Sequence, residues 1–163
     1  MSGVGRRLGI DLGDRRIGLA VAVDDAPPRG LPTMMRAERA SADAARLSVI
    51  CGEQRIERLV IGLPLHSDGR ASTQGEKTLR WADEVAGQLR LPVTFIDERY
   101  SSERAKERVG RQGGGAGGGE PGPRRRAAYR ASIDQAAAEL ILEDEADPSL
   151  HVDPGLIRAG GEA

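Results

Sequence analysis

The chain has 163 residues, of which 39% are hydrophobic and 30% are charged, and its net charge is −1. These values favour one water-soluble globular domain over a disordered chain, and the single cysteine, Cys51, excludes an internal disulfide framework and a thiolate zinc site. No apolar run approaches the ~20 residues of a membrane-spanning helix and no export signal is recognisable, so we expect a cytoplasmic protein without a membrane partner.

Apolar runs, helical spacing and turn residues predict strands and helices in a characteristic order. The elements are strands at 8–12, 17–23 and 31–36, a helix at 42–55 capped by Ser41, a strand at 59–63, a helix at 73–89, a strand at 93–96, and helices at 102–111 and 124–144. They predict an α/β fold with a mixed five-stranded sheet and helices on both faces. The underlying order, β-β-β-α-β-α-β-α, is that of the ribonuclease H-like fold.

Helical spacing also predicts which faces of the helices are buried. In helix 42–55 we expect Ala45, Val49 and Ile50 to face the core. Helix 124–144 carries an apolar stripe formed by Ile133, Ala136, Ala137, Leu140 and Ile141. Residues 148–163 are polar and contain glycine and proline, so we predict one domain over 1–147, followed by a poorly ordered tail.

Basic and acidic residues are unevenly distributed along the chain. Residues 99–130 carry nine basic side chains against three acidic ones, a net charge of +6, whereas 139–163 carry seven acids against one arginine, a net charge of −6. A basic segment of this density suits the phosphate backbone of a nucleic acid, and the 2% of aromatic residues argues against a base-stacking platform. The arginines expected to contact nucleic acid are Arg15, Arg16, Arg99, Arg104, Arg111, Arg124, Arg125, Arg126 and Arg130.

A glycine-rich tract separates the last two predicted helices. Residues 113–122 contain seven glycines in ten positions, which is incompatible with regular structure. One interpretation is a plain connector. The other is a flexible lid that becomes ordered when nucleic acid docks on the arginines that follow it.

Three acidic residues occupy positions where chemistry is expected. Asp11 ends the first strand, Glu98 follows the last strand, and Asp134 lies near the middle of the final helix. If the first strand is central, the final helix packs across the sheet edge that holds Asp11 and Glu98. Three carboxylates there would repel one another unless a divalent cation neutralised them. Mg²⁺ or Mn²⁺ prefers such ligands, and these ions activate a water and stabilise the leaving oxygen of a phosphodiester.

Each of the three acids also has a purely structural interpretation. Asp11 could accept backbone N–H groups in the turn that follows it. Glu98 could pair with Arg99 or cap the next helix. Asp134 could form an ion pair with Arg130, one helical turn earlier. Their joint placement in this strand order favours the metal site.

Four motifs resemble those of the YqgF family: GIDLGDRRIGLAV at 9–21, VIGLPLHSDG at 60–69, FIDERYSS at 95–102 and SIDQAAAELIL at 132–142. They follow one another in the order and spacing of that family. Members of the family are described as Holliday junction resolvases and as pre-16S rRNA nucleases. The resemblance implies that Asp11, Glu98 and Asp134 are the catalytic, metal-holding acids of this chain.

The sequence therefore favours a metal-dependent endonuclease that processes structured RNA, specifically the 5′ end of pre-16S rRNA. The alternative is a resolvase that cuts branched DNA with the same site. A resolvase needs a homodimer, whereas an RNA nuclease could also act as a monomer. A third hypothesis is a nucleotide-binding module, because DLGDRRIG at 11–18 resembles the phosphate turn of actin-like folds, although 163 residues leave no room for their second domain. An inactive scaffold is disfavoured by the three intact acids.

Overall fold

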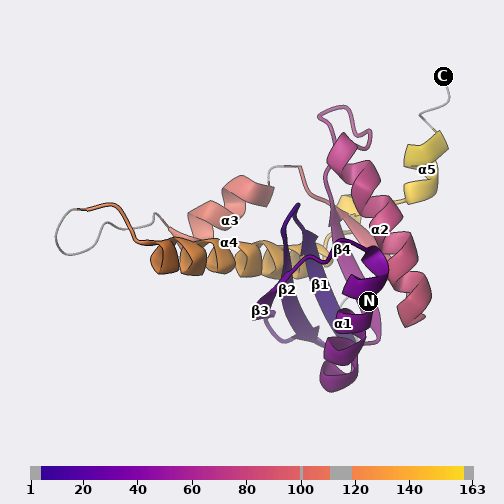
Figure 1. Ribbon diagram of the computed structural model, residues 1–163. Helices are drawn as coiled ribbons and strands as arrows, with labels where there is room; N and C mark the ends of the chain where they lie inside the picture. Colours follow the sequence, from indigo (N-terminus) through magenta and orange to yellow (C-terminus); the bar gives the residue numbers. More distant parts are fainter. Residues whose placement is uncertain (1–4, 100, 111–118, 160–163) are drawn as a thin grey trace.

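A six-stranded mixed sheet forms the centre of the fold, and the computed structural model describes residues 5–99, 101–110 and 119–159 (Figure 1). The strands are β1 (Arg6–Leu12), β2 (Arg16–Val23), β3 (Arg29–Met35), β4 (Arg58–Leu63), β5 (Val93–Asp97) and β6 (His151–Val152). Their order across the sheet is β3-β2-β1-β4-β5-β6. Because β1, β4 and β5 run parallel, their carboxyl ends meet at one edge of the sheet.

The first two strands form the predicted hairpin. Gly13 and Arg16 close it through a backbone hydrogen bond of 2.9 Å, and Asp11 lies directly across from Gly18 in the antiparallel register. The apolar run in β1 reflects its central position, where both faces of the strand are covered. The first strand is therefore central, which is the condition that the sequence prediction of a metal site required.

Helices cover both faces of the sheet, as predicted. The helices are α1 (Ala40–Gln54), α2 (Thr73–Leu89), α3 (Ser101–Val109), α4 (Pro123–Asp144), the 3₁₀ turn η1 (Pro148–Leu150) and α5 (Pro154–Ala159). α1 and α2 bury the main apolar cluster against one face of the sheet. α4 packs on the other face, and α3 packs on α4 rather than on the sheet.

The buried face of α1 differs from the prediction. Of the three residues predicted to face the core, Ile50 is partly buried against it, but Ala45 is exposed and Val49 is 60% exposed. Ala44 and Leu47 are buried in their place. The helix begins at Ala40 after an N-cap, Arg39, that makes no side-chain cap hydrogen bond, so the predicted cap at Ser41 is also wrong.

The rotation of α1 has a physical cause in a buried acid. Asp43 is fully buried and accepts hydrogen bonds from the Ala37 backbone N–H at 2.8 Å and from the Trp81 indole N–H at 3.0 Å. These bonds turn the side of the helix that carries Asp43 inward. An apolar pattern cannot reveal this arrangement, because the deciding residue is charged.

α4 is the longest helix and only part of it covers the sheet. Its 22 residues span roughly 33 Å, and its first half runs beyond the strands beside α3 (Figure 1). Gly122 and Pro123 begin it, which matches the preference for proline in the first helical turn. The predicted stripe is confirmed, because Ala136, Ala137, Leu140 and Ile141 are buried and Ile133 is partly buried.

The sixth strand comes from the segment that the sequence assigned to a poorly ordered tail. β6 pairs antiparallel with β5, and the structure gives residues 148–159 regular elements. The sheet thus has six strands rather than the predicted five. A two-residue strand is too short to leave a periodic signal in the sequence, so only pairing with β5 defines it.

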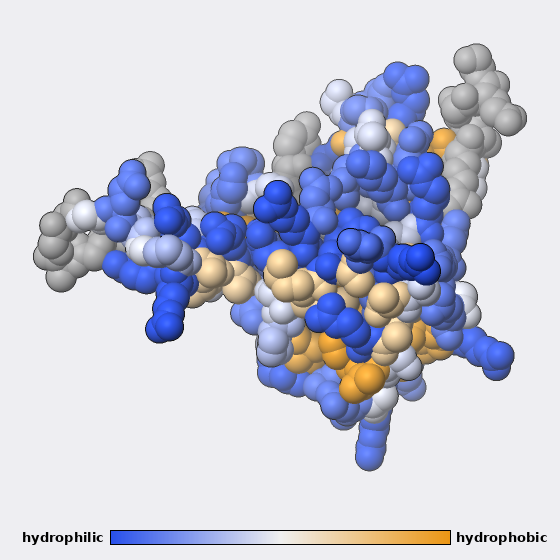
Figure 2. Space-filling view, in the orientation of Figure 1, coloured by the Kyte–Doolittle hydropathy of each residue, from blue (hydrophilic) through white to orange (hydrophobic). Residues whose placement is uncertain are grey.

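The surface shows one apolar region on the face drawn in Figure 2. Apolar side chains gather there over α1 and β3, where Val49 and Met35 are exposed. Within the part of the chain that the structure describes, no helix combines the length and apolar character needed to cross a membrane.

Candidate active site

The three predicted acids lie on the α4 side of the sheet, at the edge where the parallel strands end. Asp11 follows Gly9 by two residues in β1, and Gly9 lies against Ala138 and Leu142 of α4. Glu98 comes directly after β5 and follows Ile96, which packs in the apolar cluster beneath α4. Side chains alternate between the two faces of a strand, so both acids face α4.

Two glycines make room for the other two acids beside Asp11. A methyl group on Gly18 would collide with the backbone carbonyl oxygen of Asp134, so the missing side chain lets α4 lie directly on β2. A methyl group on Gly62 would collide with Cγ of Glu98, whose side chain therefore lies over β4, the strand next to β1. At both positions the absence of a side chain on the strand lets the acidic residue lie close to the sheet.

The electrostatics of the site reflect this crowding of negative charge. Burial and, to a smaller extent, the charge of Asp134 raise the pKa of Asp11 from 3.8 to about 6. Glu98 is only 8% exposed. The pKa of Arg104 is raised chiefly by its hydrogen bond with Asp144, against the opposing effect of burial, and the charge of Glu98 adds to the rise.

Asp134 is held by an arginine that lies far away in the sequence. Nε of Arg16 donates a hydrogen bond of 2.7 Å to Oδ2 of Asp134, and the exposed fractions of the two side chains are 33% and 15%. The structural alternative foreseen for Asp134 was a pair with Arg130, and the ion pair is made with Arg16 instead. No local sequence signal predicts this pair, because the two residues are 118 positions apart and their contact depends on how α4 packs on β2.

The three carboxylates are of the type that binds a hard divalent cation, although they do not lie close enough together to form a metal-binding group. Carboxylate oxygens are the ligands that Mg²⁺ and Mn²⁺ prefer, and the guanidinium of Arg16 already occupies Asp134 as a cation. Among the described residues, no group of three or more Asp, Glu, His or Cys side chains is close enough to hold a metal ion. The three residues fit such an ion because all are carboxylates and all lie on the same face of the sheet. Asp134 is at present hydrogen-bonded to Arg16.

The arginines predicted to contact nucleic acid fall into two groups in the structure. Arg99 is paired with Asp97 at 2.6 Å, and Arg104 is paired with Asp144 at 2.7 Å. Arg16 is paired with Asp134 at 2.7 Å. The exposed members of the set are Arg15 in the β1–β2 turn and, in the first turns of α4, Arg124, Arg125, Arg126 and Arg130. The basic excess of 99–130 is thus partly cancelled by acids of α4.

Two predictions fall on residues outside those that the structure describes. They are the contact assigned to Arg111 and most of the glycine tract at 113–122. The choice between a lid and a plain connector therefore stays a prediction.

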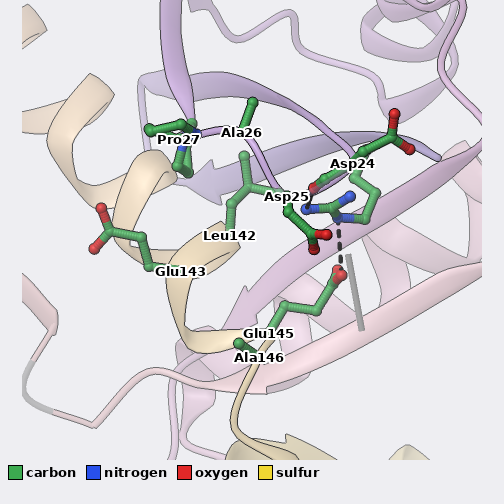
Figure 3. A pocket seen from close by; sticks show the side chains of 10 residues that line it. Asp24, Asp25, Ala26, Pro27, Leu142, Glu143, Glu145 and Ala146 are labelled. Carbon is green, nitrogen blue, oxygen red and sulfur yellow. Dashed lines mark hydrogen bonds and ion pairs between the residues drawn. The ribbon is translucent and has the colours of Figure 1, made fainter. Parts of the chain in front are cut away.

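A hollow at the C-terminal end of α4 is lined by several acidic side chains, which do not suit a phosphate backbone. Its walls carry Asp24, Asp25 and Glu143, and the dashed line in Figure 3 marks the ion pair of Glu145 with Arg7 at its floor. Carboxylates in this number repel a polyanion, so the hollow does not compete with the edge that holds Asp11.

Comparison with known proteins gives consistent matches along most of the chain. The family model described as "RuvX: Holliday junction resolvase" matches residues 5–147. A protein of Synechococcus elongatus named "Putative pre-16S rRNA nuclease" is 38% identical over 141 residues, which cover 86% of this chain and 87% of the relative. A protein of the same name from Thermosynechococcus vestitus is 34% identical over 155 residues, with 94% and 95% covered.

A solved structure shares the fold. T. thermophilus RuvC in complex with a Holliday junction substrate aligns with a TM-score of 0.51 at 18% identity, and the alignment covers 90% of this chain and 98% of RuvC. At this level of identity the likeness establishes the architecture of the sheet and its helices.

Proposed function

The chain belongs to the RuvX family of nucleases, and from this we propose that it is a metal-dependent endonuclease that matures the 5′ end of pre-16S rRNA. The family membership and the fold confirm the resemblance and the ribonuclease H-like architecture predicted from the four motifs. The chain is thus a hydrolase of phosphodiester bonds that acts on nucleic acid. Metal dependence, the RNA substrate and an expected cytoplasmic location are the proposed part.

The observation that supports this proposal most strongly is that the three acids lie at the same edge and on the same face of the sheet. Asp11, Glu98 and Asp134 come from β1, the end of β5 and α4. Gly62 leaves space for the side chain of Glu98, and Gly18 lets the backbone of Asp134 lie close to β2. We assign these three residues as the catalytic acids and as the ligands of Mg²⁺ or Mn²⁺. A bound ion would help to ionise the attacking water and would stabilise the leaving oxygen.

The protein's own groups contribute charge and position. With a pKa of about 6, Asp11 is mostly ionised at neutral pH, but its ionised form is disfavoured by burial and by Asp134. A cation at the site would relieve that penalty, and Glu98 is held in place by its burial over Gly62. A carboxylate that is already held in place, as Glu98 is, needs little reorganisation when the substrate arrives.

The substrate would be held mainly through its phosphates. Arg15 is exposed next to the site, and the first turns of α4 present Arg124, Arg125, Arg126 and Arg130 on the segment that extends beyond the sheet (Figure 1). Arginine is well suited to phosphate because its planar group donates two parallel hydrogen bonds. Binding through such contacts should weaken steeply as salt is added.

RNA is the favoured substrate because the curated relatives from Synechococcus elongatus and Thermosynechococcus vestitus carry the name of an rRNA nuclease. The alternative, cleavage of four-way DNA junctions, is favoured by the description of the family model and by the RuvC-like fold. Symmetric junction cleavage requires two active sites and therefore a homodimer. Sedimentation of the purified chain distinguishes a monomer, which suits only the RNA reaction, from a dimer.

Side-by-side cleavage assays test the proposal. A 5′-labelled rRNA precursor and a four-way DNA junction are incubated with the protein and Mg²⁺ or Mn²⁺. We expect the wild type to cut the RNA at its 5′ end and Asp11→Asn to lose at least about a hundredfold in rate. The matched control is Asp25→Asn, an exposed acid in the distant hollow, which should cut like the wild type. Equal cleavage by Asp11→Asn and the wild type would remove the catalytic assignment.

A further inference from the structure

Arg16 occupies a position that neither phosphate binding nor strand packing explains. It is the first residue of β2, and its backbone carbonyl is fixed by the N–H of Gly13, which closes the hairpin. Its side chain lies on the same face as Gly18, and Gly18 lies against the backbone of Asp134. The fold therefore directs this one arginine along the final helix toward an acid of the site.

The ion pair between Arg16 and Asp134 is short and partly buried. The distance of 2.7 Å between Nε of Arg16 and Oδ2 of Asp134 is typical of a charge-assisted hydrogen bond. Asp134 is 15% exposed and Arg16 is 33% exposed, so water screens the pair less than it screens a fully exposed one. The pair can nevertheless open, because the arginine reaches solvent from the edge of the sheet.

A divalent cation that binds through Oδ2 of Asp134 needs the oxygen that this guanidinium occupies. An arginine side chain does not lose its proton in proteins, so the cation can take this oxygen only when the arginine side chain moves away. No three acids among the described residues are gathered into a metal-holding group while Asp134 is engaged with Arg16. The arginine thus stands in for part of the positive charge that three neighbouring acids require.

We propose that Arg16 is the resident counter-ion of the metal site, which holds Oδ2 of Asp134 in the metal-free protein and must leave this oxygen before a divalent cation can bind to it. The proposal rests on the proposed function, because it takes Asp134 to be a metal ligand. Arg16 is a positioning residue in this scheme. It limits repulsion among the three acids when no metal ion is bound, and it sets the concentration of metal ion at which the site fills.

The test is the affinity of the full-length, metal-stripped protein for Mn²⁺ alone, measured by titration calorimetry without nucleic acid. Arg16→Gln should bind Mn²⁺ about tenfold more tightly than the wild type, because the competing cation is gone. Arg15→Gln is the matched control. It removes the same charge one residue away from an exposed side chain, and we expect its affinity to change by less than about twofold.

A second variant guards against misfolding of Arg16→Gln. Arg16→Lys keeps the charge but offers a compact ammonium in place of the planar guanidinium, so we expect Mn²⁺ affinity between those of the wild type and Arg16→Gln. Thermal unfolding with and without Mn²⁺ gives an independent reading, since tighter binding to the folded state raises the melting temperature further. A purely structural role for Arg16 would predict weaker binding and a smaller rise in both variants.

The outcomes separate this inference from the function on which it rests. Equal tightening in Arg16→Gln and Arg15→Gln would show a general field effect and overturn the proposal, and so would weaker binding in Arg16→Gln. If Asp11→Asn abolishes cleavage while Arg16→Gln leaves the affinity for Mn²⁺ unchanged, the proposed function stands and the counter-ion role fails. If the wild type neither binds Mn²⁺ nor cleaves, both fail together.

Discussion

Two clusters of charged side chains lie under α4 at opposite ends of the same sheet face. At one end Glu145 lies between Arg7 at 2.9 Å and Arg58 at 3.0 Å, with Glu145 only 3% exposed. At the other end Asp11, Glu98 and Asp134 lie on the same face as one arginine, Arg16, which is paired with Asp134 at 2.7 Å. Asp134 and Glu145 are eleven residues apart, about three helical turns, so one stripe of α4 contributes to both clusters.

The difference between the two ends lies in the balance of charge. The buried carboxylate of Glu145 is balanced by the two arginines with which it pairs, and it fastens the end of α4 to β1 and β4. Around Asp11 the three acids outnumber the one arginine, Arg16, that pairs with them, and burial, followed by the charge of Asp134, raises the pKa of Asp11. A balanced cluster needs nothing more, whereas an unbalanced one has room for a cation from solution.

The largest effect is expected at the balanced end. Glu145→Gln leaves Arg7 and Arg58 without their buried counter-ion and should lower the free energy of unfolding by about 3–5 kcal/mol. Urea denaturation measures this loss. Glu143→Gln is the matched control, since its pair with Arg108 is 40% and 39% exposed and should contribute less than about 1 kcal/mol. Equal losses in the two variants would contradict the distinction between the clusters.

The next effect concerns Asp11 and depends on pH. Its pKa is raised in the folded protein, so the folded state holds a proton more firmly than the unfolded chain between pH 4 and 6. The contribution of Asp11 to stability is therefore present at low pH and is lost as the pH rises through about 6.

Asp11→Asn lacks this loss, so the metal-free variant should match the wild type near pH 4 and exceed it above pH 6. The difference is at most about 3 kcal/mol, from a pKa shift of about two units. Denaturation curves at several pH values, with chelator present, measure it. A stability difference that does not vary with pH would contradict the raised pKa of Asp11 in the folded protein.

A smaller effect is expected from the space reserved for Glu98. Gly62→Ala places a methyl group against Cγ of Glu98 and Cδ1 of Ile141, and overpacking of this kind costs about 1–3 kcal/mol. Gly87→Ala is the control, because this exposed helical glycine of α2 has open space around it and should gain up to about 1 kcal/mol. The two variants are compared by thermal unfolding, and a gain in stability for both would show that Gly62 is not tight.

The smallest effect extends the comparison to nucleic-acid binding. Arg126→Gln should lower the slope of log affinity against log salt by about 0.7, the amount lost with one phosphate contact to a single strand. Arg104→Gln should leave the slope unchanged, because its guanidinium is already paired with both oxygens of Asp144. Filter binding of the rRNA precursor over a salt series, without metal, measures both slopes. A reversed order would place the substrate on α3 instead of on the first turns of α4.

Much of the fold follows from local patterns. Apolar runs located β1, β2, β4 and β5, and helical spacing located α2 with its bounds unchanged, because these patterns depend on residues within one or two turns. The edge and face shared by Asp11 and Glu98 also followed, since parallel strands end together. The buried face of α1 and the existence of β6 did not, because an internal acid and a distant strand decided them.

The sequence by itself determined the element order, the family, and the three acids that stand where chemistry is expected. Only the tertiary structure decided which charges pair. Arg16 and Asp134 are 118 residues apart, and Arg104 and Asp144 are 40 apart, so no local spacing links them. Residue type and period report the geometry of one element, whereas an ion pair depends on how two elements pack. The packing of α4 on β2 places Asp134 in the candidate site, where it is paired with the guanidinium of Arg16.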